Sequence, residues 1–248
     1  MNYFLTFIII AACIFLVYCF IPSWWARNMS SKVLRKGSRS NMQIALTFDD
    51  GPSAEYTPQL LNILKGYNIK ATFFLVGQRA AQNPWIVKRI QSEGHSIGCH
   101  SFYHQHAWLF TPGKTYNDLE NASKTISGIT GTPIHWYRPP WGTFNLLSMP
   151  FAKKLGMKPA YWSIEAQDWD KKTTIEHIYT TVINNAQNGS IIVLHDNGGA
   201  KGAPQKTLKA LPVIIDTLLQ KGYPFVTLDE MMQSANIPTN AAKETDKI

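Results

Sequence analysis

Residues 190–196 read Ser-Ile-Ile-Val-Leu-His-Asp, a run of four aliphatic residues that ends in a histidine and an aspartate. A strand with one face in water alternates apolar and polar residues, whereas an uninterrupted aliphatic run is typical of a parallel strand covered by helices on both faces. The polar pair that closes the run predicts that chemistry lies where this strand ends.

Similar runs recur along the chain and alternate with amphipathic segments. The predicted strands are Ile44–Phe48, Lys70–Val76, His95–Cys99, His135–Arg138, Lys158–Ser163, Ser190–His195 and Pro224–Leu228. The predicted helices, whose apolar residues recur at helical spacing, are Thr57–Gly66, Pro84–Glu93, Tyr116–Gly128, Thr173–Gln187 and Thr207–Gly222. This alternation predicts an α/β fold with a parallel sheet and helices outside it.

The positions of polar residues distinguish a barrel from an open sheet. Six of them fall at or just after the ends of different predicted strands: Asp49, Asp50, His100, Arg138, Asp168 and His195. Barrels draw their functional residues from the ends of several strands, whereas an open sheet gathers them at one switch point. The pattern therefore favours a seven-stranded (β/α) barrel.

Composition limits what else the chain can be. With 248 residues, 45% hydrophobic and 16% charged, it is large enough for one globular domain but too short for two with linkers. Its three cysteines are too few and too scattered for a disulfide framework. The net charge of +8 favours anionic partners, but the basic run is not interleaved with aromatic residues, so no nucleic-acid partner is expected.

The N-terminus reads as a membrane anchor. Tyr3 to Ile21 is uncharged and apolar over about the length that a bilayer core requires, and Trp24 and Trp25 follow as interfacial aromatics do. A cleaved signal peptide would begin with basic residues and have a shorter apolar core. We predict a transmembrane anchor at 1–21, a basic juxtamembrane linker at 22–41, a globular domain at 42–234 and a polar tail at 235–248.

The anchor carries an orientation signal. Five basic residues follow the apolar segment and none precedes it: Arg27, Lys32, Arg35, Lys36 and Arg39. By the positive-inside rule, this asymmetry favours a single-pass protein whose globular domain is cytoplasmic.

Two motifs predict a metal site. Asp49 and Asp50 are adjacent at a strand end and point in opposite directions, so one can bind a cation while the other accepts a proton. His100 and His104 are spaced to reach one ion from a single helical turn, and with a carboxylate they form the open three-ligand site of catalytic zinc. Singly, each motif also fits a solvated turn or an incidental histidine pair.

Two further motifs could complete an active site. Arg138 ends a strand and could hold a carboxylate, and the following Pro139 and Pro140 fix the backbone so that the next N–H can serve as an oxyanion donor. His195 would become a proton donor near neutral pH if a carboxylate raised its pKa.

Taken in order, the motifs Thr47–Pro52, His100–His104, Arg138–Trp141, Asp168-Trp169 and His195 resemble those of the polysaccharide deacetylases of carbohydrate esterase family four, the NodB-homology domain. The resemblance runs from about Gln43 to Met232. It implies a distorted (β/α)7-type barrel and a hydrolase that removes N-acetyl groups from an amino-sugar polysaccharide or glycolipid. It also implies one divalent ion, with zinc expected and cobalt as a substitute.

The resemblance assigns roles position by position. Asp49 matches the general base, and Asp50 with His100 and His104 matches the metal ligands. The other catalytic positions are Arg138, which holds the base, Trp141, whose backbone N–H binds the oxyanion, and Asp168, which tunes the general acid His195. The substrate-binding positions are Trp169, Val193, Pro139 and Pro140.

Alternatives of two kinds remain. An O-acetyl esterase would use the same machinery, and a saccharide-binding module without activity would have lost a ligand or the acid, which this sequence retains. The expected partners are an N-acetylated glycan or lipid-linked sugar and the membrane, with the protein acting as a monomer. Relatives of the family mostly work outside the cell, which opposes the orientation signal of the basic residues.

Overall fold

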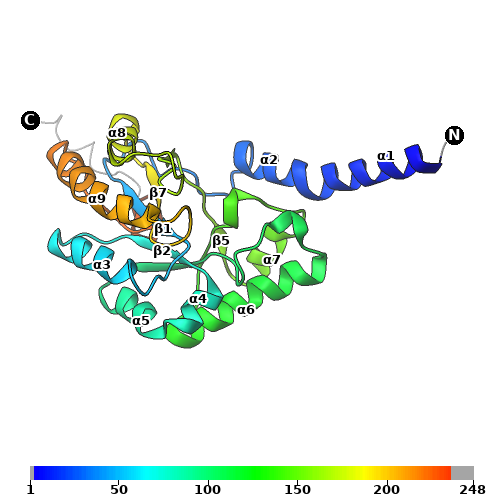
Figure 1. The fold of residues 1–248 in the computed structure, drawn as a ribbon, viewed down its shortest axis with the longest axis horizontal. Coiled ribbons are helices and arrows are strands. Elements are labelled where there is room, and N and C mark those ends of the chain that lie inside the picture. The colour runs from blue at the N-terminus through cyan, green and yellow to red at the C-terminus, as the bar shows by residue number, and fades with distance from the viewer. Residues whose placement is uncertain (1–2, 236–248) are drawn as a thin grey trace, which may run out of the picture.

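A curled sheet of seven parallel strands forms the centre of the computed structural model, which describes residues 3–235 (Figure 1). The strands are β1 (Ala45–Asp49), β2 (Thr72–Leu75), β3 (Ser96–Cys99), β4 (Trp136–Tyr137), β5 (Lys158–Pro159), β6 (Ile164–Glu165) and β7 (Ile191–His195). Their order across the sheet is β5-β4-β3-β2-β1-β7-β6. Because β5 and β6 are the two edges, the barrel is incomplete, and the predicted seven-stranded parallel α/β architecture is confirmed.

Helices cover the outside of the sheet. They are α3 (Thr57–Gly66), α4 (Gly77–Gln82), α5 (Pro84–Ser92), α6 (Pro112–Thr130), α7 (Ser148–Lys154), α8 (Ile175–Asn185), α9 (Ala203–Gln220) and α10 (Leu228–Ala235). Two short 3-10 turns, η2 (Ala107–Leu109) and η3 (Pro140–Gly142), lie in the loops that follow β3 and β4. The predicted helices all form, with ends that differ by a few residues.

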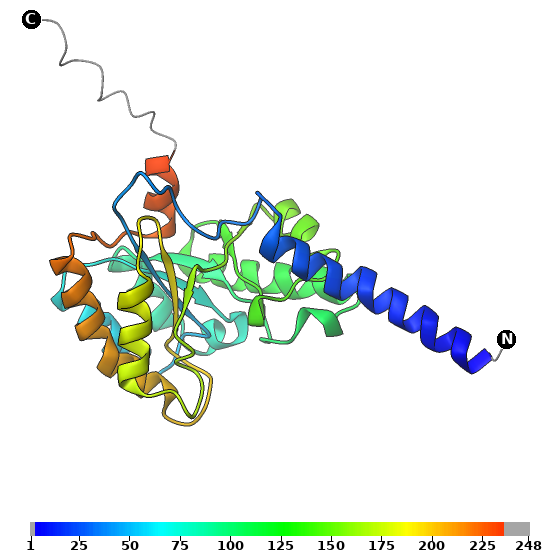
Figure 2. The same ribbon diagram turned by 90° about the horizontal axis from the view of Figure 1, so that it is seen from above.

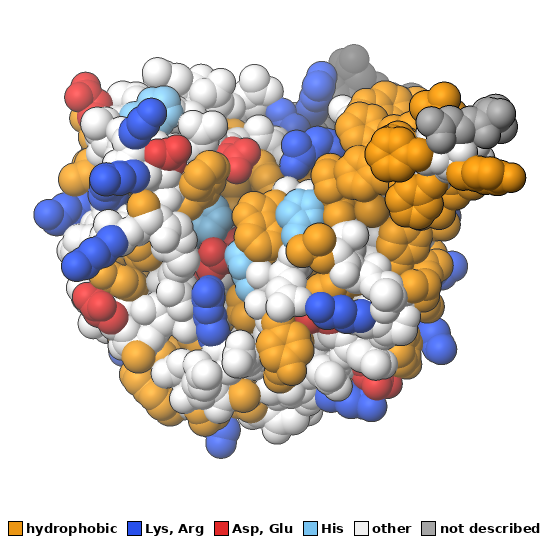
Figure 3. All heavy atoms as spheres, turned by 45° about the vertical axis from the view of Figure 1, so that its right-hand side comes forward, with side chains coloured by type: hydrophobic (Ala, Val, Ile, Leu, Met, Phe, Trp, Pro, Cys, Tyr) orange, Lys and Arg blue, Asp and Glu red, His pale blue; other side chains and the backbone are white. Residues whose placement is uncertain are grey.

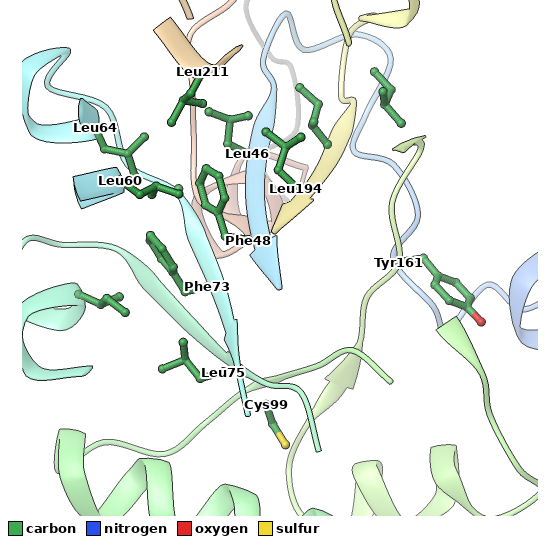
Figure 4. Close-up of a cluster of buried hydrophobic side chains, with 14 of the residues drawn as sticks. Leu46, Phe48, Leu60, Leu64, Phe73, Leu75, Cys99, Tyr161, Leu194 and Leu211 are labelled. Atoms are coloured by element: carbon green, nitrogen blue, oxygen red, sulfur yellow. The ribbon is translucent and has the colours of Figure 1, made fainter. Parts of the chain in front are cut away.

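The main core lies between the sheet and the helices α3 and α9. Figure 4 shows Leu46, Phe48 and Phe73 of the sheet directed toward Leu60 and Leu64 of α3 and Leu211 of α9, and all six side chains are fully buried. The rings of Phe48 and Phe73 lie 5.3 Å apart. Truncating a buried aromatic residue in such a core to alanine typically costs about 3–5 kcal/mol.

Two predicted strands differ in the structure. Pro224–Leu228 is not a strand: it contributes only a bridge between Phe225 and Ile44, and α10 begins at Leu228. The predicted Lys158–Ser163 strand ends at Pro159 because the chain then bridges to Leu34, and the carbonyls of Ala160 and Tyr161 accept hydrogen bonds from Arg138. The seventh strand is instead β6, whose two residues are too short to carry a pattern.

The register of β1 and β7 positions the site. Thr47 pairs with Val193, and Asp49 pairs with His195. Since alternate residues of a strand share a face, these four residues lie on one side of the sheet. Arg138 contacts both Thr47 and Asp49, so this side faces the barrel interior.

One continuous helix precedes the domain and extends away from it (Figures 1 and 2). It consists of α1 (Tyr3–Phe15), a π-helical turn η1 (Leu16–Phe20) and α2 (Ile21–Asn28). By length and composition this helix could cross a membrane. The predicted anchor and the start of the predicted linker therefore form a single rod.

The rest of the predicted linker packs on the domain as a strap. Arg35 caps the end of α2 by donating to the carbonyls of Ala26 and Arg27, and Leu34 bridges to Ala160. Gly37 then donates its N–H to the carbonyl of Gly189. Of the predicted tail, residues 236–248 lie outside the described part of the chain.

Candidate active site

Asp49 and Asp50 stand at the C-terminal end of β1. Asp50 adopts a left-handed conformation with φ of 74°, which turns the chain and separates the two carboxylates. Asp49 stays on the interior face beside Arg138, whereas Asp50 faces His100 and His104. The predicted division of the pair between two environments is therefore present in the structure.

Asp50, His100 and His104 offer ligand atoms that lie within 4.8 Å of one another. Oδ1 of Asp50 is 3.2 Å from Nε2 of His100 and 2.7 Å from Nε2 of His104. The two histidines do not share a helical turn, contrary to the sequence-based expectation. They lie on a loop in which Ser101 and His104 have φ values of 70° and 54°, and this left-handed backbone brings both rings to one point.

The three side chains fit a divalent ion. Nδ1 of His100 lies 2.7 Å from the carbonyl oxygen of Arg138, which can only accept, so Nδ1 carries the proton and Nε2 is left free to ligate. Burial alone would raise the pKa of Asp50, but His100 and His104 hold that pKa well below its usual range. A carboxylate and two imidazoles form the donor set of an open zinc site.

The loop from His100 to His104 is held in place by a residue that the sequence analysis did not identify. The carboxylate of Asp118 in α6 accepts the backbone N–H groups of Phe102 and Tyr103, at 3.1 and 3.3 Å. Burial raises the pKa of Asp118, which these two N–H groups and nearby Ser101 oppose. In the sequence, only its helical spacing with Thr115, Leu119 and Ala122 places Asp118 on the buried face of α6.

Arg138 is the largest fully buried side chain of the described residues. Its Nη1 donates to Oδ1 of Asp49 and to Oγ1 of Thr47, both at 2.7 Å, and its Nη2 donates to the carbonyl of Tyr161 at 2.8 Å. The guanidinium also stacks over the ring of Phe74 at 4.0 Å. These contacts fix one oxygen of Asp49 and leave Oδ2 without a hydrogen bond to any described residue.

His195 is held on the other side of the site by Asp168. Nδ1 of His195 lies 2.7 Å from Oδ1 of Asp168, and the backbone N–H of His195 donates to Oδ2. Burial would lower the pKa of His195, but the Asp168 carboxylate outweighs it and raises the pKa to about 10. Thr207 of α9 donates a further hydrogen bond to Oδ2 of Asp168 at 2.7 Å, and nothing in the local sequence of Thr207 predicts this contact.

Two exposed tryptophans, Trp141 and Trp169, lie next to these residues in the chain or in space. Trp141 lies in a left-handed conformation, is 55% exposed, and its ring lies 4.6 Å from that of His104 and 5.4 Å from that of His106. Trp169 is partly exposed. Figure 3 shows histidine and acidic side chains together in a shallow hollow, with hydrophobic groups beside it.

The other predicted substrate contacts are less accessible. Val193 is 1% exposed and lies two residues before His195 on β7. Pro139 and Pro140 are buried in the turn before Trp141. The structure places all three next to the site but not at its surface, and their contact with substrate remains a prediction.

A buried carboxylate behind the site was also not anticipated. Asp196 accepts a hydrogen bond from the Thr57 hydroxyl, and burial raises its pKa to about 7. In the loop that follows, Gly198 has φ of 72° and lies so close to Oδ2 of Asp50 that a side chain there would collide with it. This end of β7 therefore packs directly against Asp50, one of the three candidate metal ligands.

The family model of the polysaccharide deacetylases matches residues 36–160. A peptidoglycan-N-acetylglucosamine deacetylase of Bacillus cereus is 38% identical over 192 residues, which cover 77% of this chain and 88% of that protein. The chain belongs to the polysaccharide deacetylase family. It is a hydrolase, and the family resemblance seen in its motifs is confirmed.

Solved structures agree with this deacetylase in fold. The peptidoglycan N-acetylglucosamine deacetylase Bc1960 superposes with a TM-score of 0.78 at 34% identity, covering 84% of this chain and 95% of that one. A family 4 acetyl xylan esterase from Clostridium thermocellum, solved with a cobalt ion, superposes with a TM-score of 0.72 at 34% identity, covering 79% and 93%. The incomplete α/β barrel is thus the fold of the family.

Proposed function

We propose that this deacetylase hydrolyses N-acetyl groups on the amino sugars of a glycan, using a divalent ion held by Asp50, His100 and His104. The observation that carries the proposal is the pairing of Asp49 with His195 across β1 and β7, with the three ligands beside them. A base and an acid on neighbouring strands, next to a metal site, are the groups that amide hydrolysis requires.

The ligand set supports a zinc ion, with cobalt as a substitute. Such an ion lowers the pKa of bound water and polarises the carbonyl under attack. The proposed task of the chain is to hold Asp50 ionised and to turn Nε2 of both histidines toward it, which the Arg138 carbonyl does for His100.

Asp49 is proposed to accept the proton of the attacking water. Arg138 occupies Oδ1 of Asp49, and Oδ2 has no hydrogen bond to any residue that the structure describes. One oxygen therefore fixes the orientation and the other is free for the proton. The backbone N–H of Trp141 would stabilise the negative charge on the carbonyl oxygen as water adds.

His195 is proposed to protonate the leaving nitrogen. Asp168 binds Nδ1, so the proton to be transferred resides on Nε2 of the imidazolium. Its raised pKa keeps the ring protonated near neutral pH. Water and the amide are thereby converted into acetate and a free amine.

Relatives suggest the substrate class. The Bacillus cereus relative is named for N-acetylglucosamine in peptidoglycan, which favours an N-acetylated cell-wall glycan. The second candidate is an O-acetyl ester of a xylan-like glycan, favoured by the structural similarity to an acetyl xylan esterase. Both reactions would use the same residues, so the substrate must be assigned by assay.

The N-terminal helix is proposed to anchor a monomeric enzyme in the membrane, with the catalytic domain outside the cell. Its exposed apolar surface and length support an anchor. The basic residues after it favour a cytoplasmic domain. However, a large domain can override that bias, and a peptidoglycan substrate lies outside the membrane.

Mass spectrometry on a panel of acetylated glycans tests the substrate. Incubation with N-acetylglucosamine oligomers and peptidoglycan fragments should remove acetyl groups and release acetate, and the Asp49→Asn protein should not. Turnover of acetyl xylan without any loss of N-acetyl groups would replace the amide substrate by the ester.

A further inference from the structure

The N-terminal helix does not leave the domain as a free tether. It contacts the domain through residues that belong to its own apolar segment. The ring of Phe15 packs edge-on against Trp108 with centroids 5.2 Å apart, and the Tyr18 hydroxyl donates to the carbonyl of Phe110 at 3.0 Å. Both partners lie in or next to the η2 turn.

The π-helical turn η1 adds a backbone hydrogen bond to the contact between the helix and the domain. A π turn displaces carbonyls from the regular helical hydrogen-bond pattern. The carbonyl of Tyr18 accepts the N–H of Leu146 at 2.8 Å, and one turn later the Ser23 hydroxyl bonds the carbonyl and N–H of Phe144. Two segments, 106–110 and 144–147, are therefore fixed to the helix.

These contacts determine the depth of the domain once the helix is in a bilayer. If Ile21 marks the end of the apolar segment, Tyr18 lies about 4–5 Å and Phe15 about 9 Å deeper along the axis. Trp24 and Trp25, expected at the headgroup level, lie still further out. The domain residues that contact Phe15 and Tyr18 must therefore lie at or below the headgroups.

The surface at that level is apolar. Leu109 is 75% exposed and Leu146 is 50% exposed, and each is adjacent in sequence to, or part of, a contact with the helix. A groove of about 430 Å³ between the helix and Trp108 is lined by Phe7, Ile10, Ala11, Ile14, Phe15, Tyr18 and Cys19. Figure 3 shows this hydrophobic surface running from the helix toward the hollow of the site.

We infer that Leu109 of η2 and Leu146 of the 144–147 turn insert into the leaflet that receives the helix, and that lipid chains fill the groove beside Trp108. The partner is the bilayer, because Leu109 and Leu146 flank the contacts that Trp108 and Leu146 make with the proposed membrane-spanning helix. The inference rests on the membrane anchoring proposed above and holds for either orientation of the domain.

This second contact would fix the active site relative to the membrane. His106, which caps η2, stacks on Trp141, and Trp141 packs on the metal-site residue His104. The wall that touches the leaflet is thus also one side of the substrate opening. The opening is held next to the membrane surface, where an acetylated sugar carried by a lipid or by newly made wall polymer would be met.

Depth-dependent quenching tests the contact in the full-length protein. Single cysteines are introduced as Leu109→Cys and Ile14→Cys, with Leu219→Cys on α9 as a control on an exposed site away from the helix. The background carries Cys13→Ala, and the remaining Cys19 and Cys99 are buried. Each protein is labelled with a nitrobenzoxadiazole dye and reconstituted into phosphatidylcholine–phosphatidylglycerol vesicles with or without doxyl-labelled lipid.

The dye at positions 14 and 109 should emit at shorter wavelength in vesicles, and the doxyl lipid should quench most of its fluorescence. The fluorescence of the dye at position 219 should be almost unquenched. Quenching at 14 without quenching at 109 would overturn the inference and leave the anchor intact. Absence of quenching at 14 would overturn the proposed anchor and, with it, the inference.

Discussion

The guanidinium of Arg138 donates a 2.7 Å hydrogen bond to Oδ1 of Asp49, and the two side chains are only 0% and 3% exposed. A buried ion pair gains little over an apolar pair, but removal of one partner leaves the other charge buried and uncompensated. An ionised carboxylate at this depth therefore needs a counterion, which Arg138 supplies to Asp49. The same guanidinium bonds Thr47 and the carbonyl of Tyr161, so it also joins β1 to the segment after β5.

We expect Arg138→Met to destabilise the fold by about 3–5 kcal/mol and to reduce turnover by about a hundredfold or more, because it removes the counterion of Asp49. Urea unfolding and acetate release would measure the two effects. The double variant Asp49→Asn/Arg138→Met should recover part of the stability, since no charge is left buried alone, but none of the activity. A double variant no more stable than Arg138→Met would show that the carbonyl contacts, not the ion pair, dominate.

Substitution of His104, a proposed metal ligand, should abolish activity. A chelator should inactivate the wild-type protein, and zinc or cobalt should restore it, because the ligands match an open zinc site. His104→Ala should bind zinc much more weakly, as measured by calorimetry. His177, which lies on the exposed side of α8 away from the site, provides the matched control His177→Ala. Full activity of a metal-stripped His104→Ala protein would contradict the metal role.

The base and the acid can be separated from the metal site. Asp49→Asn and His195→Ala should each retain zinc binding, since neither residue belongs to the ligand cluster, while turnover falls by at least about a hundredfold. Metal content measured on the same preparations distinguishes loss of chemistry from loss of the ion. Activity within a few-fold of wild type in either variant would refute that residue's role.

The sequence could predict most of this site because its residues end strands whose patterns are strong. Asp49, Arg138 and His195 each follow or close an apolar segment, and parallel strands bring their ends to one edge. The loop of His100 and His104 could not be derived, because helical spacing and a left-handed loop give the same i, i+4 pattern. Asp118 and Thr207 support the site from helices, and single polar residues on apolar helix faces have no characteristic spacing.

In the fold as well, elements with a strong sequence pattern could be predicted and short or weakly paired ones could not. The aliphatic run of β7 is specific, whereas β6 has two residues, and its place in the sheet depends on pairing with Ile192 and Val193. Residues 224–228 have strand-like composition but lie where Ile44 offers only one bridge. The docking of the N-terminal helix depends on side-chain contacts with Trp108 and Phe144, which hydropathy alone does not reveal.

The pH dependence of turnover should respond to Asp168. The Asp168 carboxylate raises the pKa of His195, so removal of its charge in Asp168→Asn should lower that pKa. Because the acid must be protonated to act, the high-pH limb of kcat/KM should move to lower pH in the variant. The value of about 10 applies without an ion, and a bound cation near His195 should place the wild-type limb below it.

Histidine NMR on metal-free protein gives an independent measurement of the same shift. Thr207→Val is a useful companion, since it removes one hydrogen bond to Asp168 and keeps the charge. Thr207→Val should move the high-pH limb of kcat/KM by less than Asp168→Asn does. If both variants kept the wild-type limb, His195 would not be the group that the high-pH limb reports.

The orientation of the catalytic domain can be decided with a thiol reagent. We expect an external domain because the named relatives act on peptidoglycan. Several of the basic residues that favour the opposite orientation also have partners in the fold: Arg35 caps α2, Arg27 lies over the ring of Tyr161 at 5.6 Å, and Lys36 bonds Gln187. Their presence therefore has a structural explanation besides topology.

Cys19 and Cys99 are buried, so a Leu219→Cys variant in the Cys13→Ala background offers one exposed thiol. A membrane-impermeant maleimide should label it in intact cells, while a cytosolic marker enzyme stays unlabelled and the Cys13→Ala parent shows no signal. Labelling that requires lysis would place the domain in the cytoplasm, as the positive-inside rule predicts. The substrate would then have to be an acetylated sugar reachable from that side, such as one attached to a membrane lipid.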